Sequence, residues 1–204
     1  MRGRNPTLSA HAADIVDVFR NMSLSDGEEE ECGSAASQPP IAVEMDISKY
    51  VGAWFQMYAS LGPKYTFELG GRNVTAFYAP TTRPGVISVL NQTKPTRLLP
   101  SVQAKGFAVQ SKEHSGILHV SFNAKTEANA RFEEPGNYWV LGIGPVINGL
   151  YDWAVVSDSV KSSVYILTRD MLRFEKRYEK AILAFVESIG FTKESNKPRK
   201  TTYR

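Results

Sequence analysis

The sequence predicts an all-β protein: an eight-stranded antiparallel up-and-down β-barrel with one C-terminal α-helix packed on the outside. Eight short runs of apolar or alternating residues follow residue 46, and Gly, Pro, Asn and Asp separate them. The nine Tyr, ten Phe and three Trp lie almost entirely in this part, and aromatic side chains suit strands. A single helical repeat follows the last run. Many short strands at even spacing, followed by one helix, are typical of a barrel with an external helix.

The first 44 residues differ in composition from the rest. Ile15, Phe19 and Met22 fall near helical spacing, and residues 23–40 are rich in Ser, Glu, Gly and Pro, which bury too little surface to fold. We therefore expect three parts. These are a disordered or weakly helical extension with an acidic linker at 1–44, a barrel plus helix at 45–192, and a basic tail at 193–204.

Each predicted strand begins after a turn signal and ends at the next one. Gly85, Pro135-Gly136 and Asn148-Gly149 are examples of these signals, because Gly and Asn accept the backbone conformations that tight turns need. The predicted strands cover residues 54–58, 73–79, 86–92, 102–110, 117–123, 138–143, 151–156 and 164–169.

One amphipathic helix follows the last strand. Phe174, Tyr178, Ile182 and Val186 recur at helical spacing, and Gly190 is a suitable end. The outside of the barrel can supply the apolar surface that this stripe needs.

A basic cluster closes the sequence, formed by Lys193, Lys197, Arg199, Lys200 and Arg204. We expect a solvated, frayed end there. A basic tail could also contact an anionic membrane surface or nucleic acid. No basic stripe with interleaved aromatic residues runs through the body of the chain, so nucleic acid is not expected as a partner.

Strand alternation predicts what lies inside the barrel. Eight strands enclose a space that is either filled by side chains or holds one small ligand. The small residues Ala76, Gly142 and Ala154 fall on apolar inward faces and favour a hollow, although a filled core would show similar stripes. Such a hollow suits a lipid, a sterol, a pigment or a retinoid.

Two motifs then indicate a family. Gly52-Ala53-Trp54, after a short predicted turn of helix, resembles the G-x-W signature at the start of the first lipocalin strand. Residues 165–169, which end in Arg169, resemble the last strand of that family. The resemblance implies that Arg169 stacks on Trp54 and closes the barrel floor, a cation–π contact of about 1–2 kcal/mol when desolvated. Gly52, Trp54 and Arg169 are thus expected to be structural.

Further matches occur in family order between these motifs. Residues 73–78, 137–141 and 151–158 resemble the second, sixth and seventh strands of the bacterial and apolipoprotein D-like lipocalins. The sequence departs from the family in a longer Gly-rich loop before Tyr151, where the usual Asp is missing, and in lacking the usual disulfides. The loop at 60–72 resembles the lid over the barrel mouth.

Alternation and the resemblance together predict the ligand-binding side chains. They are expected to face inward from the strands, and the tyrosines among them could offer a hydroxyl to a headgroup or bond to one another. The set comprises Gln56, Tyr58, Ala76, Tyr78, Val89, Val120, Phe122, Tyr138, Val140, Val156 and Tyr165.

The resemblance implies binding and transport or sequestration of a small hydrophobic ligand. No catalytic residues, metal or cofactor are expected, because the sequence has no paired carboxylates on one inward face, no Gly-rich phosphate loop and no metal-ligand spacing. A lipid-modifying enzyme on the same scaffold is one alternative, but Cys32 lies in the N-terminal extension and His11, His114 and His119 are scattered. A barrel that serves as an interaction module without a ligand is the other alternative.

The sequence also bears on the compartment and the partners of the protein. No stretch reaches the roughly 18 apolar residues of a membrane helix, and aspartates interrupt the apolar run near the N-terminus, so no signal peptide is expected. With one cysteine there is no intrachain disulfide, and we expect a cytoplasmic protein. A misassigned start would instead allow a secreted or membrane-associated one. Peripheral contact with a membrane or lipid is a further expectation, and the oligomeric state is left open.

Overall fold

The structure is a computed structural model and describes residues 41–62, 72–94 and 100–203. The chain divides into two units, Met1–Gln38 and Pro39–Arg204, and every described residue lies in the second unit. The predicted N-terminal helix and acidic linker, Cys32, and most of the predicted lid at 60–72 lie outside the described residues.

The elements follow the predicted order closely. They are η1 (Ile47–Lys49), β1 (Gly52–Ala59), β2 (Arg72–Pro80), β3 (Val86–Lys94), β4 (Val102–Gln110), β5 (Ile117–Ser121), η2 (Glu127–Asn129), β6 (Tyr138–Ile143), β7 (Val146–Ile147), β8 (Leu150–Tyr151), β9 (Trp153–Ser157), β10 (Val164–Thr168), α3 (Met171–Arg177), α4 (Glu179–Ser188) and β11 (Arg199–Lys200).

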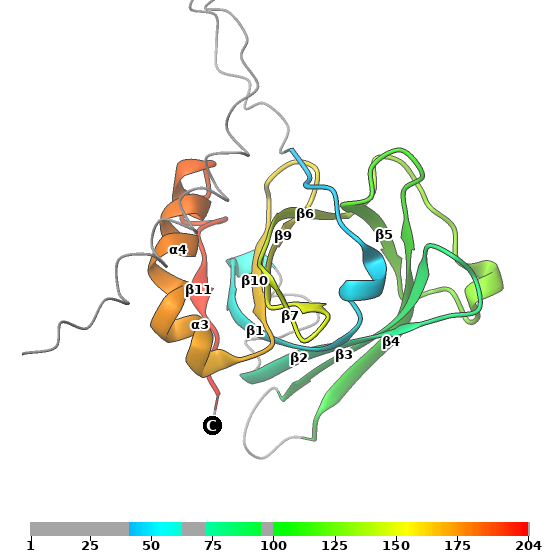
Figure 1. Cartoon of the computed structure of the whole chain (residues 1–204), viewed down its shortest axis with the longest axis horizontal. Coiled ribbons are helices and arrows are strands. Elements are labelled where there is room, and N and C mark those ends of the chain that lie inside the picture. Colours follow the sequence, from blue (N-terminus) through cyan, green and yellow to red (C-terminus); the bar gives the residue numbers. More distant parts are fainter. Residues whose placement is uncertain (1–40, 63–71, 95–99, 204) are drawn as a thin grey trace, which may run out of the picture. The chain divides into compact units, whose positions relative to one another are not determined.

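Eight of these strands close into a barrel (Figure 1). The antiparallel ladder runs through β1, β2, β3, β4, β5, β6, β9 and β10, and β10 returns to pair with β1. The predicted eight-stranded antiparallel barrel is confirmed, and every strand finds a partner on both sides, so the wall has no exposed edge.

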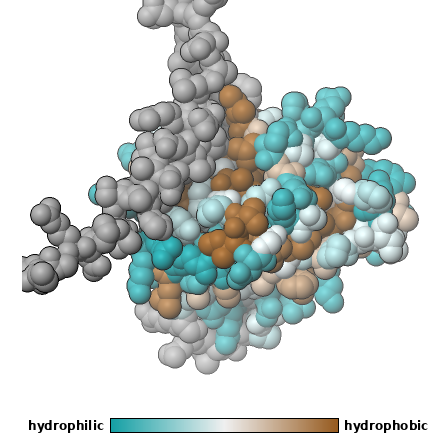
Figure 2. Space-filling view, viewed as in Figure 1, coloured by the Kyte–Doolittle hydropathy of each residue, from teal (hydrophilic) through white to brown (hydrophobic). Residues whose placement is uncertain are grey.

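One end of the barrel, the closed end, is covered by η1 and by the β7–β8 hairpin, both of which cross it in Figure 1. Asn148 and Gly149 adopt φ angles of 51° and 80°, the left-handed pair that a two-residue hairpin turn requires. The backbone N–H of Asp46 donates to the Tyr151 hydroxyl at 3.0 Å and links the two covering elements. Figure 2 shows this end filled by side chains, hydrophobic ones among them.

The residues ahead of η1 are also held to the barrel. The Val43 N–H donates to the Val140 carbonyl at 2.8 Å, and the Met45 N–H donates to Ser115 Oγ at 2.8 Å. Gly116 permits the first contact, because a Cβ there would lie 1.8 Å from the Val43 carbonyl oxygen. The barrel thus includes the chain from residue 43 onward.

Two short helices, α3 and α4, replace the single expected helix, and Tyr178 lies between them. Phe174, Ile182 and Val186 are buried, so the predicted apolar stripe does pack on the outside of the barrel (Figure 1). No helix among the described residues has the length and apolar character needed to span a bilayer.

Gly142 does not face the barrel interior as expected. A Cβ at this position would lie 3.2 Å from Phe185 of α4, so Gly142 faces the helix. The cause is an irregularity between Val140 and Gly142 in the pairing of β6 with β9, which shifts the alternation by one residue. Gly142 therefore admits the helix and leaves no room inside the barrel.

The C-terminal tail is not frayed. β1 pairs with β2 only from Gly52 to Phe55, and beyond that point β11 pairs with β1 in its place. The Asn73 N–H of β2 donates to the Thr202 carbonyl at 3.0 Å on the other side of the tail. The last residues thus lie between β1 and β2 at the open end of the barrel.

Candidate functional site

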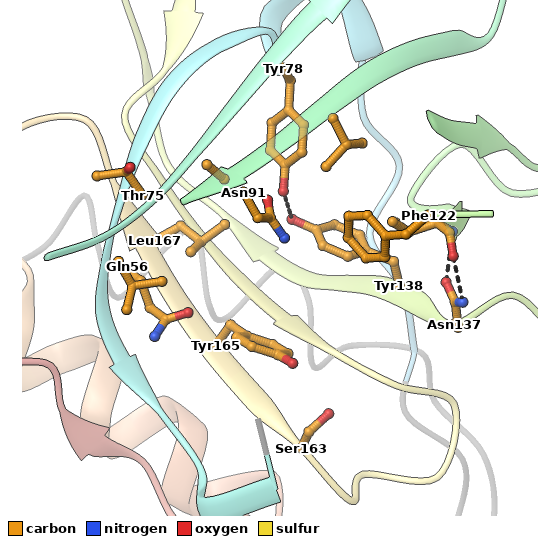
Figure 3. A pocket seen from close by; sticks show the side chains of 14 residues that line it. Gln56, Thr75, Tyr78, Asn91, Phe122, Asn137, Tyr138, Ser163, Tyr165 and Leu167 are labelled. Carbon is orange, nitrogen blue, oxygen red and sulfur yellow. Dashed lines mark hydrogen bonds between the residues drawn. The ribbon is translucent and has the colours of Figure 1, made fainter. Parts of the chain in front are cut away.

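The half of the barrel away from η1 contains a cavity of about 360 Å³ (Figure 3). Six strands and three loop positions contribute side chains to its wall, and most of these side chains are apolar or aromatic. The lining residues are Gln56, Val74, Thr75, Ala76, Tyr78, Val89, Asn91, Val120, Phe122, Asn137, Tyr138, Ser163, Tyr165 and Leu167.

Most of the side chains predicted to bind a ligand come together in this cavity. Eight of the eleven line it: Gln56, Ala76, Tyr78, Val89, Val120, Phe122, Tyr138 and Tyr165. Ala76 is the only one of the three small residues emphasised in the sequence that contributes to the hollow. That these side chains bind a ligand stays a prediction.

Tyr58 was predicted to face the cavity and does not. Its hydroxyl donates to Glu179 of α4 at 2.6 Å, so the ring lies on the outer surface of the wall. The pairing of β1 with β10 shifts between Gln56 and Tyr58, and this bulge puts Tyr58 on the opposite face from the one that strict alternation gives.

Val140 and Val156 were predicted to bind ligand, but they do not line the cavity and lie nearer the closed end of the barrel. They pair across β6 and β9, and neither side chain is exposed. Both belong to the cluster that fills the closed half of the barrel, together with Tyr50, Trp54, Met45, Leu118 and Ala154. They face inward as the alternation predicts, at a level where the interior is packed.

Six lining residues were missing from the prediction: Val74, Thr75, Asn91, Asn137, Ser163 and Leu167. Val74, Asn91 and Leu167 lie two positions from predicted neighbours, so alternation could have found them. Thr75 follows a register shift in β2, and Asn137 and Ser163 lie outside the strands, so their positions depend on the folded barrel.

Three tyrosines form a hydrogen-bonded group at the floor of the cavity. The Tyr138 hydroxyl lies 2.8 Å from the Tyr50 hydroxyl and 3.2 Å from that of Tyr78, as Figure 3 shows for the second contact. Burial raises the pKa of Tyr78 to about 12, and burial together with the neighbouring phenols raises the pKa of Tyr138 well above its ordinary value. These phenols therefore stay protonated at neutral pH and can act as hydrogen-bond donors.

The amide side chains around the cavity differ in their partners. Asn137 is fully engaged: its Oδ1 accepts from the Val120 N–H at 2.7 Å and its Nδ2 donates to the Val120 carbonyl at 2.9 Å. Gln56 donates to Thr201 Oγ1 of the C-terminal tail at 3.4 Å. Asn91 differs, because its Oδ1 is buried and accepts no hydrogen bond.

Trp54 and Arg169 meet under the cavity as expected. The Arg169 guanidinium lies 3.9 Å from the Trp54 ring centre, and Trp54 packs on Tyr50 with ring centres 4.9 Å apart. Arg169 also donates to the Tyr151 carbonyl at 2.7 Å and to the Val51 carbonyl at 2.7 Å. The arginine thus ties the start of β1 to the β7–β8 hairpin and closes the floor.

The described side chains that line the cavity include no acidic or basic residue and no Cys or His. His119 lies beside Glu133, and His114 lies beside Glu44. Among the described residues, no group of three or more His, Cys, Asp or Glu side chains could hold a metal ion. The described wall offers apolar contacts, hydroxyls and amides, which suit binding of a small molecule.

Comparison with known proteins agrees with this geometry. The sequence profile of the lipocalin-like domain matches residues 45–198. No curated protein sequence matches the chain. Among solved structures, insecticyanin from the tobacco hornworm Manduca sexta is similar, with a TM-score of 0.52, 13% identity, and coverage of 81% of this chain and 84% of that one. The siderocalin Ex-FABP has a TM-score of 0.48 and 11% identity, over 76% of this chain and 94% of its own.

Proposed function

Because the lipocalin-like profile covers residues 45–198, the chain belongs to the lipocalin-like domain family, and we propose that it binds a small hydrophobic ligand inside the barrel for transport or sequestration. The proposal starts from the family and its barrel fold, because members of this family bind small hydrophobic ligands. The observation that carries the proposal is the apolar cavity of about 360 Å³ above a closed floor.

The cavity has the size and lining that this role needs. Small-molecule sites usually enclose roughly 300–1,000 Å³ and combine apolar walls with a few polar groups. Val89, Val120, Phe122 and Leu167 supply the apolar part. The filled lower half, with Arg169 under Trp54, leaves the opposite end as the route of access.

Several finer statements belong to the same proposal. We place the protein near the bacterial and apolipoprotein D-like lipocalins, on the strand motifs quoted above. We propose that it carries its ligand without chemical conversion, because the described cavity side chains include none of the usual acid, base or nucleophile pairs. A cytoplasmic location and peripheral contact with a lipid surface are part of the proposal.

Filling the cavity tests the function. Ala76 faces the cavity from β2, so Ala76→Trp should occupy much of the space and lower the affinity for the fluorescent probe N-phenyl-1-naphthylamine by at least about tenfold. Phe77→Trp is the matched control, because Phe77 is the next residue of the same strand and is 49% exposed. Fluorescence titration of each purified variant measures the dissociation constants.

The control should bind the probe like the unmodified protein. Equal affinity for all three proteins would mean that the probe binds elsewhere. No measurable binding to the unmodified protein, with this probe or with any aliphatic competitor, would refute the carrier proposal.

A further inference from the structure

One lining residue has a polar group that the protein leaves unpaired. Asn91 lies on β3, opposite Ala76 of β2, and its side chain points into the cavity in Figure 3. Its Oδ1 is buried and has no hydrogen-bond partner. A buried acceptor without a partner costs stability, whereas a ligand that donates to it would recover that loss on binding.

The cavity also lacks a compensating charge among the described residues. The nearest floor cation, Arg169, lies beneath the Trp54 ring and is engaged by backbone carbonyls. Lys200 and Glu179 lie with Tyr58 on the outside of the wall. A carboxylate in the cavity would therefore lose its hydration without gaining a cation, which disfavours an anionic ligand.

The tyrosines add a second hydrogen-bonding group. Three hydroxyls carry three protons, but the group makes only two mutual contacts, through Tyr138 to Tyr50 and Tyr78. One proton therefore remains for a partner outside these two contacts. Tyr78 and Tyr138 both line the cavity, so the floor can donate to an oxygen atom of a ligand.

From these observations we propose that the ligand is a neutral, hydroxyl-bearing apolar molecule, such as a long-chain alcohol or a sterol, whose hydroxyl pairs with the Asn91 amide. This inference rests on the carrier function proposed above and specifies its ligand class. A hydroxyl both donates and accepts, as an amide does, so the two groups match in either orientation of the amide. A carboxylate only accepts, and a hydrocarbon or an ether leaves Oδ1 unpaired.

A matched ligand series tests the preference. Decanol, decyl methyl ether and decanoate compete with N-phenyl-1-naphthylamine for the full-length protein at about pH 8, where the carboxyl is ionised. We expect decanol to displace the probe at a concentration at least about tenfold lower than either of the others. At about pH 4 the acid becomes neutral, so its affinity should rise toward that of decanol, whose own affinity should stay constant.

Two variants then locate the preference at Asn91. Asn91→Leu has a similar volume and removes the amide, so the preference for decanol over the ether should shrink to about threefold or less. Its melting temperature should stay equal or rise, because an unpaired buried oxygen is lost. Thr93→Val is the matched control: Thr93 Oγ1 on the same strand is also buried and unpaired, but Thr93 does not line the cavity. This variant should keep the full preference.

The outcomes separate the two proposals. If the probe binds but decanoate competes as well as decanol at about pH 8, the carrier function stands and the neutral ligand class is wrong. An unchanged preference in Asn91→Leu would also overturn the assignment. If the Leu variant does not fold, the ligand series on the unmodified protein decides alone. Binding of neither the probe nor the competitors would instead refute the carrier function itself.

Discussion

At the scale of single residues, the barrel floor depends on the packing of three residues: Gly52, Trp54 and Arg169. Gly52 has a φ of 95°, and a Cβ there would lie 3.0 Å from the Arg169 guanidinium. Only glycine takes this backbone conformation without strain and leaves the arginine room to reach the Trp54 ring. The G-x-W signature is therefore a packing requirement of the floor, and the described geometry gives it no contact with the cavity.

Arg169→Ala should destabilise the barrel more than it affects ligand binding. The variant loses the stacking on Trp54 and the hydrogen bonds that join β1 to the β7–β8 hairpin, which together are worth about 2–4 kcal/mol. Thermal unfolding followed by circular dichroism should show a drop of at least about 4 °C. The probe affinity below the transition should change little. An unchanged melting temperature would remove the floor-closing role of this residue.

Asp158 organises the loop between β9 and β10, next to the cavity residue Ser163. Its Oδ1 accepts from the backbone N–H groups of Val160 and Ser162, and its Oδ2 accepts from the Ser162 and Ser163 hydroxyls. Burial alone would raise the pKa of this carboxyl, but these hydrogen bonds outweigh it and hold the pKa below the ordinary 3.8. The ionised form is therefore favoured by folding.

Asp158→Asn should show this contribution through its pH dependence. Because the folded-state pKa is depressed, Asp158 stabilises the protein above about pH 4 and loses that effect as the pH falls through the folded-state value. The free energy of unfolding should differ between the two proteins by a constant amount from about pH 5 to 8, and the difference should shrink below about pH 4. Urea unfolding at several pH values measures it. A difference that grows with acidity would contradict this account.

At the scale of elements, the C-terminal tail completes the barrel wall. β1 and β2 separate beyond Phe55, and residues 199–203 occupy the space between them. The Thr201 N–H donates to the Met57 carbonyl at 2.8 Å, and the Tyr203 hydroxyl donates to the carbonyls of Gln56 and Val74. Because Gln56 and Val74 both line the cavity, the tail forms part of the barrel wall next to the cavity.

Removal of residues 199–204 should weaken both the barrel and the retention of a ligand. The lost strand pairing and side-chain hydrogen bonds are worth about 2–4 kcal/mol in the free energy of unfolding, and the probe should dissociate faster through the opened wall. Urea unfolding and stopped-flow fluorescence measure the two effects.

Tyr203→Phe, which removes only the hydroxyl, should lower the free energy of unfolding by about 1 kcal/mol. A truncated protein of unchanged stability would show that the tail adds nothing to the wall.

At the scale of the whole molecule, the barrel interior has two levels. The level near η1 is packed around Trp54, Leu118, Val140 and Val156, and the level near the open end is hollow. The packed level provides the buried apolar surface that stabilises the fold. The hollow level buries less apolar surface and so contributes less to the free energy of unfolding, but it leaves the space that a ligand needs.

Deletion of residues 1–40 should leave the barrel and its cavity intact. All described lining residues lie between Gln56 and Leu167, and the first described contact with the barrel comes at Val43. The probe affinity of the shortened protein should stay within about twofold of that of the full chain. A larger loss would assign part of the binding site to the N-terminal segment and would favour the reading of the protein as an interaction module.

Alternation along the strands predicted much of the site, and its failures share one physical cause. It located Ala76, Tyr78 and Val120 because regular pairing puts every second residue on one face. It failed at Tyr58 and Gly142, where the strand pairing shifts by one residue. A bulge depends on how a strand fits both neighbours around a closed barrel, and no local pattern marks it.

The sequence by itself determined the eight barrel strands and the position of the helical region, because periodicity and turn residues act locally along the chain. The Trp54–Arg169 contact was expected from the resemblance to the lipocalin family, and the structure has it. Only the tertiary structure decided which inward side chains surround the hollow and which fill the core. It also decided that Asn91 Oδ1 lacks a partner and that the C-terminal tail lies between β1 and β2. These features depend on the depth along the barrel axis and on the closure of the sheet, which only the folded chain defines.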